Sequence, residues 1–279
     1  MTGHTNPTYR RRRLGRRLQH LREKAGMTLD EAAPKLDKTR SSLNRIETGE
    51  TRADVHLIRS MMDLYDHLEG DLLDLSRQAA KNGWWRAYGI EDMGYVDAET
   101  EATGVLEFSG LNVPGLLQTE AYMRTQLSAG APRSAERLEN DVQVRLIRQR
   151  RLTDQHHPLE LTAIVDEAAL HREVGGTQVM AEQARHLANT TELQNVTLQL
   201  LPFNTRAHDA MNGSFTMLNF PQPEEPDLLY ISHVAGGIHL DKPERVQEAR
   251  LVFDRLHSQT LSPKDSATRL TQLANDLSG

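Results

Sequence analysis

The stretch that decides the fold is Thr39-Arg-Ser-Ser-Leu-Asn-Arg-Ile-Glu-Thr-Gly49, which has the pattern of a short helix with two chemically different faces. At about 100° per residue, Leu43 and Ile46 lie on one face and the polar side chains lie on the other. The polar face is formed by Arg40, Ser41, Asn44 and Arg45. Thr39 is a favourable N-cap residue, and Gly49 supplies the permissive backbone that ends a helix. Because Arg and Asn side chains match the edges of guanine and adenine, we predict that this face contacts bases in the major groove of DNA.

A second short helix is predicted immediately before this one. Thr28 is placed to cap a helix from residue 29 to about residue 36, and only residues 37–39 separate the two helices. So short a connection allows only a sharp corner, which predicts a helix-turn-helix unit. Pro34 falls inside the first of the two helices, where it costs on the order of 3 kcal/mol unless the helix bends or ends early.

Apolar residues at helical spacing predict further helices on both sides of this unit. They are Leu14, Leu18, Leu21 and Ala25 before it, and Ile58, Met61, Met62, Tyr65, Leu72, Leu75 and Ala79 after it. Together with the helix-turn-helix unit, these stretches predict one small bundle of five helices in roughly the first 80 residues.

Charge is unevenly distributed along the chain. The formal net charge is −6, from 33 basic and 39 acidic residues. Residues 1–52 contain 13 Lys/Arg and 6 Asp/Glu, a formal charge of +7, so the remainder carries −13. A basic N-terminal region attracts the phosphate backbone of DNA, and an acidic remainder discourages the rest of the molecule from binding it. We expect the four consecutive arginines at 10–13 to lie near DNA phosphates.

Resemblance to the phage repressor/Cro (Xre) family of helix-turn-helix DNA-binding domains is found in two segments, Gly26-Met-Thr-Leu-Asp-Glu-Ala-Ala33 and Ser41-Ser-Leu-Asn-Arg-Ile-Glu-Thr-Gly49. The resemblance implies an all-α, five-helix DNA-binding domain over residues 1–82. For base-edge contacts it implies Arg40, Ser41, Asn44 and Arg45, and for phosphate contacts Thr28, Lys38, Thr39 and Arg52. It also implies an ion pair between Arg22 and Glu47 inside the domain.

Besides Pro34, two positions depart from the family pattern. Leu29 stands where family members commonly have Gln, so the polar contact at the start of that helix is expected to be missing. Asp37 stands where the turn usually has Gly, although Asp is among the few residues that adopt the left-handed conformation at low cost.

Length and composition limit what else the chain can be. Its 279 residues leave about 195 beyond the helical bundle, enough for one more domain with its own core. The absence of cysteine excludes disulfides, thiolate zinc sites and cysteine nucleophiles. No apolar run approaches the roughly 18 residues that a membrane helix needs. We therefore expect a cytoplasmic protein that does not contact a membrane.

The pattern changes to mixed helix and strand beyond about residue 82. Gly83 breaks the last helix of the bundle, and the adjacent Trp84 and Trp85 follow it. Strands are predicted at 105–108, 159–165, 196–200, 214–220, 228–233 and 237–240, and helices at 118–127, 134–152, 177–190, 243–259 and 263–277. This arrangement indicates an α+β domain over residues 83–279 with a mostly antiparallel sheet.

The second region also resembles a known domain. The resemblance is found in Val113-Pro-Gly-Leu-Leu-Gln-Thr-Glu120, in Asp166-Glu-Ala-Ala-Leu170 and in the segment 201–215. These segments are similar to the C-terminal domain of unknown function that many actinobacterial Xre regulators contain. The resemblance extends from about residue 84 to the end of the chain. It implies pairing with a small partner protein, and some of those regulators are described as antitoxin-like.

No catalytic or metal-binding residues are predicted, and no cofactor is expected. The histidines lack metal-ligand spacing on any one predicted element. Asp166-Glu167 at the end of a strand is compatible with an acid/base pair, but such a pair more often marks the start of a helix. The candidate residues for a ligand or partner site are Trp84, Trp85, His208, Met211 and Asn212. The alternative is that the tryptophans pack in a core or domain interface and that the histidine loop is a structured turn.

The sequence therefore predicts a sequence-specific transcriptional regulator that binds a double-stranded DNA operator and is not an enzyme. A single recognition helix contacts only a few base pairs, so we expect a homodimer on two half-sites, with the C-terminal domain supplying the dimer contact. That domain is also expected to sense an effector or a small partner protein. Two alternatives remain open: an antitoxin that neutralises a cognate protein and autoregulates through its DNA-binding domain, and an enzyme tethered to DNA.

Overall fold

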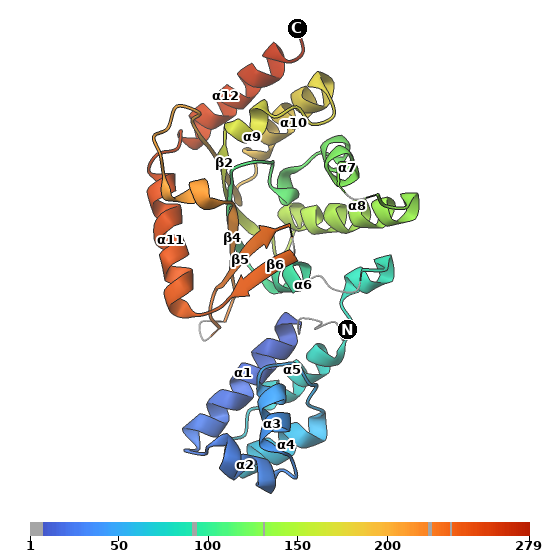
Figure 1. Ribbon diagram of the computed structural model, residues 1–279, viewed down its shortest axis with the longest axis vertical. Helices are drawn as coiled ribbons and strands as arrows, with labels where there is room; N and C mark the ends of the chain where they lie inside the picture. The colour runs from blue at the N-terminus through green and yellow to red at the C-terminus, as the bar shows by residue number, and fades with distance from the viewer. Residues whose placement is uncertain (1–7, 91–93, 131, 223–224, 235) are drawn as a thin grey trace. The chain divides into compact units, whose positions relative to one another are not determined.

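The computed structural model describes residues 8–90, 94–130, 132–222, 225–234 and 236–279 (Figure 1). The chain forms two compact units, Met1–Glu101 and Ala102–Gly279, which are called here the N-terminal unit and the C-terminal unit. The sequence places a boundary after residue 82, whereas residues 83–101 group with the N-terminal unit in the structure. Each unit is described separately.

The described part of the N-terminal unit is entirely helical. Its elements are α1 (Tyr9–Lys24), α2 (Leu29–Lys35), α3 (Arg40–Glu47), α4 (Val55–Leu64), α5 (Gly70–Ala80), the 3₁₀ helix η1 (Trp84–Tyr88) and α6 (Gly94–Glu101). The helices α1 to α5 confirm the five-helix bundle that the apolar spacing predicts. The helix α6 was not predicted.

One apolar core holds α1 to α5 together. Leu18 of α1, Leu43 of α3, Ile58 of α4 and Leu72 of α5 are completely buried in a single cluster. Each such side chain contributes roughly 1.5–3 kcal/mol through the apolar surface that it removes from water. The short helices are stable because they share this core rather than through their own length.

Two glycines allow α1 and α3 to approach closely. A Cβ atom at Gly15 of α1 would lie 2.2 Å from the carbonyl oxygen of Glu47, so no larger residue fits there. Gly49 ends α3 with a φ of +79°, and a Cβ atom there would lie 2.8 Å from the backbone nitrogen of Arg12. The glycine that was expected to stop the helix therefore also allows the segment after α3 to pack on α1.

The C-terminal unit is built on a sheet. Its described strands are β1 (Gly104–Ser109), β2 (Glu160–Asp166), β3 (Val196–Leu201), β4 (Phe215–Asn219), β5 (Leu228–His233) and β6 (Gly236–Leu240). Its described helices are η2 (Gly115–Leu117), α7 (Glu120–Ser128), α8 (Ala135–Gln149), η3 (Arg150–Thr153), α9 (Ala168–His171), α10 (Thr177–Thr190), η4 (Asp209–Asn212), α11 (Pro243–His257) and α12 (Pro263–Asp276).

The sheet is mixed, which corrects the prediction of a mostly antiparallel sheet. The strand order is β3-β2-β1-β4-β5-β6, and β1, β2 and β3 run parallel. Only the remaining pairings, from β1 to β4 onward, are antiparallel. The reason lies in the connections: α7 and α8 separate β1 from β2, and α10 separates β2 from β3. A helical connection is long enough to carry the chain back to the end of the sheet where the previous strand began, so the next strand runs parallel to it. The short connections between β4, β5 and β6 do not, so these strands run antiparallel.

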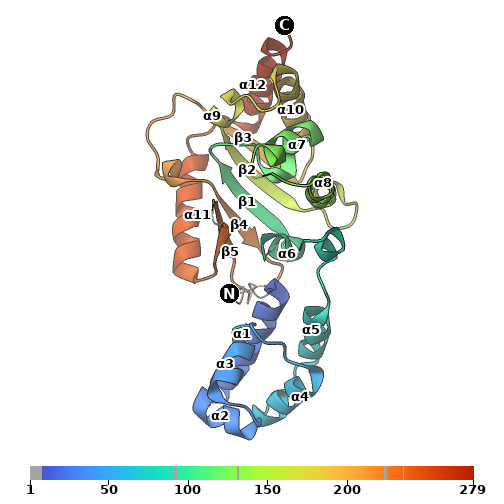
Figure 2. The ribbon, with the colours of Figure 1, turned by 45° about the vertical axis from the view of Figure 1, so that its right-hand side comes forward.

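Helices cover both faces of the sheet. Figures 1 and 2 show α11 on one face, and α7, α8 and α10 on the other. Phe253 of α11 packs in one cluster with Phe108 of β1, Ile164 of β2 and Met217 of β4. The register pairs Phe108 with Ile164 and therefore places both side chains on the face that α11 covers.

Candidate nucleic-acid interface and candidate ligand site

The sequence around α2 explains where this helix begins and ends. Thr28 accepts a hydrogen bond from the backbone of Glu31, and the Glu31 carboxylate accepts one from the backbone of Thr28 at 2.8 Å, which forms a capping box. The helix ends at Lys35, one residue after Pro34. Pro34 lacks the N–H that would bond to the carbonyl of Asp30, so α2 lacks this hydrogen bond and extends only one residue further.

A tight turn separates α2 from α3. Asp37 adopts a φ of +53°, the left-handed conformation that was expected of a residue in this place. The backbone N–H of Lys38 returns to the carbonyl of Ala33 at 2.9 Å. Thr39 then caps α3 by accepting a hydrogen bond from the backbone of Ser42 at 3.1 Å. The two helices thus form a helix-turn-helix unit with a capped start to each helix.

The faces of α3 divide as the sequence predicts. Leu43 and Ile46 are buried in the core of the bundle. The exposed side of α3 is formed by Arg40, Ser41, Asn44 and Arg45. A side chain that is to contact base edges must be free of the core, and all four of these residues meet that condition.

Two arginines on the exposed face of α3 form weak ion pairs. Arg40 Nε lies 3.3 Å from Asp30 Oδ2, and Arg45 Nε lies 3.3 Å from Glu50 Oε2. All four side chains are about half exposed or more, so water and salt screen these pairs and each contributes about 0–1 kcal/mol. Breaking either ion pair so that its arginine can contact DNA therefore costs little free energy.

Arg22 and Glu47 form a buried ion pair between α1 and α3. The guanidinium donates two hydrogen bonds to the Glu47 carboxylate, at 2.8 and 2.9 Å, and a third to the carbonyl of Met27 at 2.7 Å. Only 7% of the Arg22 side chain and 3% of the Glu47 side chain are exposed. The hydrogen bonds that Arg22 donates to Glu47 raise the pKa of Arg22. The pair fixes α3 on α1 and thereby orients its outer face.

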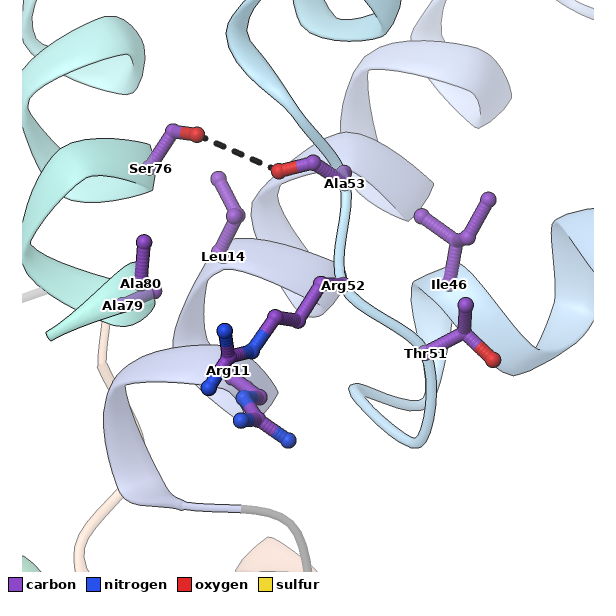
Figure 3. A pocket seen from close by; sticks show the side chains of 9 residues that line it. All are labelled: Arg11, Leu14, Ile46, Thr51, Arg52, Ala53, Ser76, Ala79 and Ala80. Atoms are coloured by element: carbon purple, nitrogen blue, oxygen red, sulfur yellow. Dashed lines mark hydrogen bonds between the residues drawn. The ribbon is translucent and has the colours of Figure 1, made fainter. Parts of the chain in front are cut away.

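The residues predicted to contact phosphates lie at the surface. Thr28, Lys38, Thr39 and Arg52 are all exposed. Arg52 follows α3, and Figure 3 shows its side chain beside that of Arg11. Both residues line a small cavity of about 20 Å³. Burial and the neighbouring charge of Arg52 lower the pKa of Arg11. Arg11 Nε is buried without a hydrogen-bond partner among the described residues. Two adjacent guanidiniums favour an anion nearby.

Arg10, the first arginine of the run at 10–13, is less available than the sequence suggests. Arg10 forms an ion pair with Glu101 of α6 at 2.6 Å. In the same helix, Asp97 accepts a hydrogen bond from the backbone N–H of Tyr9, the first residue of α1. Burial raises the pKa of Asp97 to about 6. The helix α6 therefore places two acidic side chains at the start of α1.

The two tryptophans belong to the N-terminal unit. Trp85 is buried, and its ring meets that of Trp84 edge-on with 5.9 Å between the centroids. The indole N–H of Trp84 donates to the Thr100 hydroxyl at 3.2 Å. These contacts fit the packing alternative, because an indole that is mostly covered usually bonds its N–H to a neighbour.

The other three candidate ligand residues lie in the C-terminal unit, at η4 and just before it. His208 and Met211 line a pocket of about 400 Å³, whereas the Asn212 amide donates to the carbonyl of Asp209 at 3.2 Å and closes the turn. Asp166 also lines this pocket, and its Oδ1 accepts the N–H of Ala168 at the start of α9 at 2.8 Å. The expected helix-start role of Asp166 is therefore present, but its place in the pocket was not predicted.

Two large apolar residues of the pocket were also not indicated by the sequence. Leu111 and Phe203 line the pocket and come from loops after β1 and β3. Loop positions of this kind have no period that separates them from ordinary surface residues. Within the described part of the chain, no group of three or more His, Asp or Glu residues is close enough to hold a metal ion.

Comparison with known proteins identifies both parts of the chain. A family model described as a helix-turn-helix domain matches residues 13–75, and one described as domain of unknown function DUF5753 matches residues 93–272. No curated protein and no solved structure gives a significant match. None of the helices in the described residues has the length and apolar character needed to cross a membrane. The chain belongs to the DUF5753 family, with a helix-turn-helix domain preceding its DUF5753 domain.

Proposed function

We propose that this protein is a sequence-specific transcriptional regulator of the Xre type, which acts by binding DNA rather than by catalysis. The helix-turn-helix domain supports the DNA-binding part of this proposal. The observation that supports it most is the outer face of α3, where Arg40, Ser41, Asn44 and Arg45 are exposed together. A capped helix that is fixed by a buried ion pair presents these groups in one orientation, which direct contact with base edges requires.

The roles of the exposed side chains follow from their chemistry. The guanidinium of Arg40 or Arg45 can donate two hydrogen bonds to guanine, and the amide of Asn44 can pair with adenine. Contacts with phosphates are assigned to Thr28, Lys38, Thr39 and Arg52, which fix the position of the domain on the duplex. Arg11 is added to this group because it lies beside Arg52.

The regulator is proposed to act as a homodimer on two half-sites. One recognition helix spans only a few base pairs, and paired domains of this kind bind half-sites about one helical turn apart. The C-terminal unit is assigned the dimer contact and the sensing of an effector or a small partner protein. The pocket at His208 is the observation that favours an effector.

Selection from random double-stranded DNA by the full-length protein tests the proposal. Enrichment of one motif with two related halves is the expected result, and binding should weaken steeply with salt because phosphate contacts release counterions. A matched control is Arg77→Ala, since Arg77 forms an exposed ion pair with Asp74 on α5, outside the helix-turn-helix unit. This variant should select the same motif. Recovery of unselected sequences by the wild-type protein would contradict the proposal.

A further inference from the structure

The pocket at His208 lies where four strands of the C-terminal unit meet. Its lining comes from the residues after β1, β2 and β3 and from those just before β4. The chain leaves β1 toward β2 on one side and later returns to β4 on the other side of β1. In open sheets with parallel strands, ligands bind outside the carboxyl ends of the strands at such a reversal of strand order. The topology therefore favours this pocket as a ligand site.

Apolar side chains surround the opening of the pocket. Leu111, Phe203 and Met211 are 70%, 68% and 71% exposed, although all three line the pocket. Phe108, which is buried, also lines it. Exposed apolar groups that gather around one concave site mark a place where apolar surface is covered by a ligand. The larger part of the ligand should therefore be apolar.

One polar pair lies among these apolar groups. His208 Nε2 and Asp166 Oδ2 are 4.0 Å apart, which is too long for a direct hydrogen bond. The His208 side chain is only 9% exposed, its ring packs edge-on against Phe108, and its Nδ1 has no partner among the described residues. Buried polar atoms are usually hydrogen-bonded. A hydroxyl or amine group of a ligand, placed between Asp166 Oδ2 and His208 Nε2, would donate a hydrogen bond to the Asp166 carboxylate.

The negative charge of Asp166 determines which ligand charge the pocket favours. The Asp166 side chain is 20% exposed, so its carboxylate is partly shielded from water and disfavours an anion beside it. Arg206 also lines the pocket, but it is an exposed residue. Water weakens its attraction for an anion.

We infer that this pocket binds a small, mostly apolar molecule that carries one hydroxyl or amine donor and no negative charge. The hydroxyl or amine group donates a hydrogen bond to Asp166 beside His208, and the apolar body contacts Phe203, Leu111 and Met211. The role of this ligand as an effector rests on the proposed regulatory function, whereas its binding to the C-terminal unit does not.

The probe for the test is N-phenyl-1-naphthylamine, an uncharged fluorescent molecule with an apolar body and one N–H donor. Saturable binding of one probe per full-length chain is expected. Phe203→Asp should weaken binding by about tenfold or more, because it places a second carboxylate against the apolar body. Leu251→Asp is the matched control: Leu251 is 49% exposed on α11 and is not a lining residue, so this variant should bind as the wild type does.

A second comparison tests the charge preference. 8-Anilino-1-naphthalenesulfonate has the same apolar skeleton with an added sulfonate, and it should bind about tenfold more weakly than the uncharged probe. Asp166→Asn should reduce this difference, because it removes the carboxylate and keeps a hydrogen-bond acceptor. Thermal melting of each variant checks that it is folded.

Three results would overturn the inference. They are no saturable binding of the uncharged probe, equal binding by folded Phe203→Asp and Leu251→Asp, and tighter binding of the sulfonate. The same preparations are used for the DNA selection. Motif enrichment without probe binding rejects the pocket and keeps the regulator, whereas probe binding without enrichment rejects the regulator and keeps the pocket.

Discussion

At the scale of single residues, the pair Arg22 and Glu47 has the clearest expected effect. Glu47→Gln leaves the Arg22 charge buried without its partner, which should lower the free energy of unfolding by roughly 3–5 kcal/mol. Chemical denaturation of the full-length protein measures this loss. Glu50→Gln is the control, because Glu50 pairs with Arg45 at the surface and its loss should cost about 0–1 kcal/mol. Equal stability of the two variants would show that the buried pair does not hold α3.

Asp97 predicts a pH dependence of stability. Its pKa is raised from 3.8 to about 6 by burial, so the folded state holds its proton more tightly than the unfolded state does. The stability that this group contributes is therefore present below about pH 4 and is lost as the pH rises to about 6, with a total of roughly 3 kcal/mol.

Asp97→Asn should remove this dependence and keep an acceptor for the backbone of Tyr9. Its melting temperature should exceed that of the wild type at pH 7, and the difference should disappear near pH 4. The exposed Asp63 on α4 supplies the control, since Asp63→Asn should follow the wild type at both values. A wild type that is the more stable protein at pH 7 would mean that Asp97 is stabilised as a carboxylate.

At the scale of elements, the turn between α2 and α3 depends on Asp37. Its φ of +53° costs free energy for most residues with a side chain, less for Asp, and none for glycine. Asp37→Gly should therefore change stability little or raise it by up to about 1 kcal/mol, whereas Asp37→Ala should lower it by about 1 kcal/mol. Thermal melting of both variants measures which of the two is the more stable. If the alanine variant is the more stable one, the turn does not hold this conformation.

The N-terminal elements could be predicted because local chemistry determines them. Capping at Thr28 and Thr39, the stop at Gly49 and the helical apolar period all act within a few residues. The strand positions of the C-terminal unit were also predicted, and β5 was found at the predicted residues. The parallel pairing of β1 to β3 was not, because the direction of a strand depends on which neighbour it pairs with far along the chain.

The two candidate sites also differed in how far the sequence could predict them, because one depends on local sequence and the other on distant parts of the chain. The outer face of α3 is set by one helical period, so its four exposed residues could be named from the sequence. The pocket joins Asp166 to His208 and Phe203 through the fold of the sheet. Of these three, the sequence pointed to His208 as a ligand residue, and its neighbours became apparent only from the ends of β2 and β3.

At the scale of the whole molecule, we expect two chains to form a dimer through their C-terminal units. The apolar residues of α1 to α5 are used in their own core, so the DNA-binding domain has little apolar surface left for a dimer contact. The full-length chain should therefore sediment as a dimer, and a fragment of residues 1–101 as a monomer with weakened binding to the selected motif. A monomeric full-length protein, or a dimeric fragment that binds DNA equally well, would remove the C-terminal unit from assembly.

The central claim is that the outer face of α3 determines which DNA sequence is bound. The measurement that tests it most directly is site selection repeated with Arg40→Ala, Asn44→Ala and Lys38→Ala beside the wild type. Loss of Arg40 or Asn44 should relax base preference at one position of each half-site, at a cost of about 1–3 kcal/mol, whereas loss of Lys38 should weaken all sequences alike and reduce the salt dependence. Selection of an unchanged motif with unchanged affinity by the Arg40 and Asn44 variants would contradict the claim.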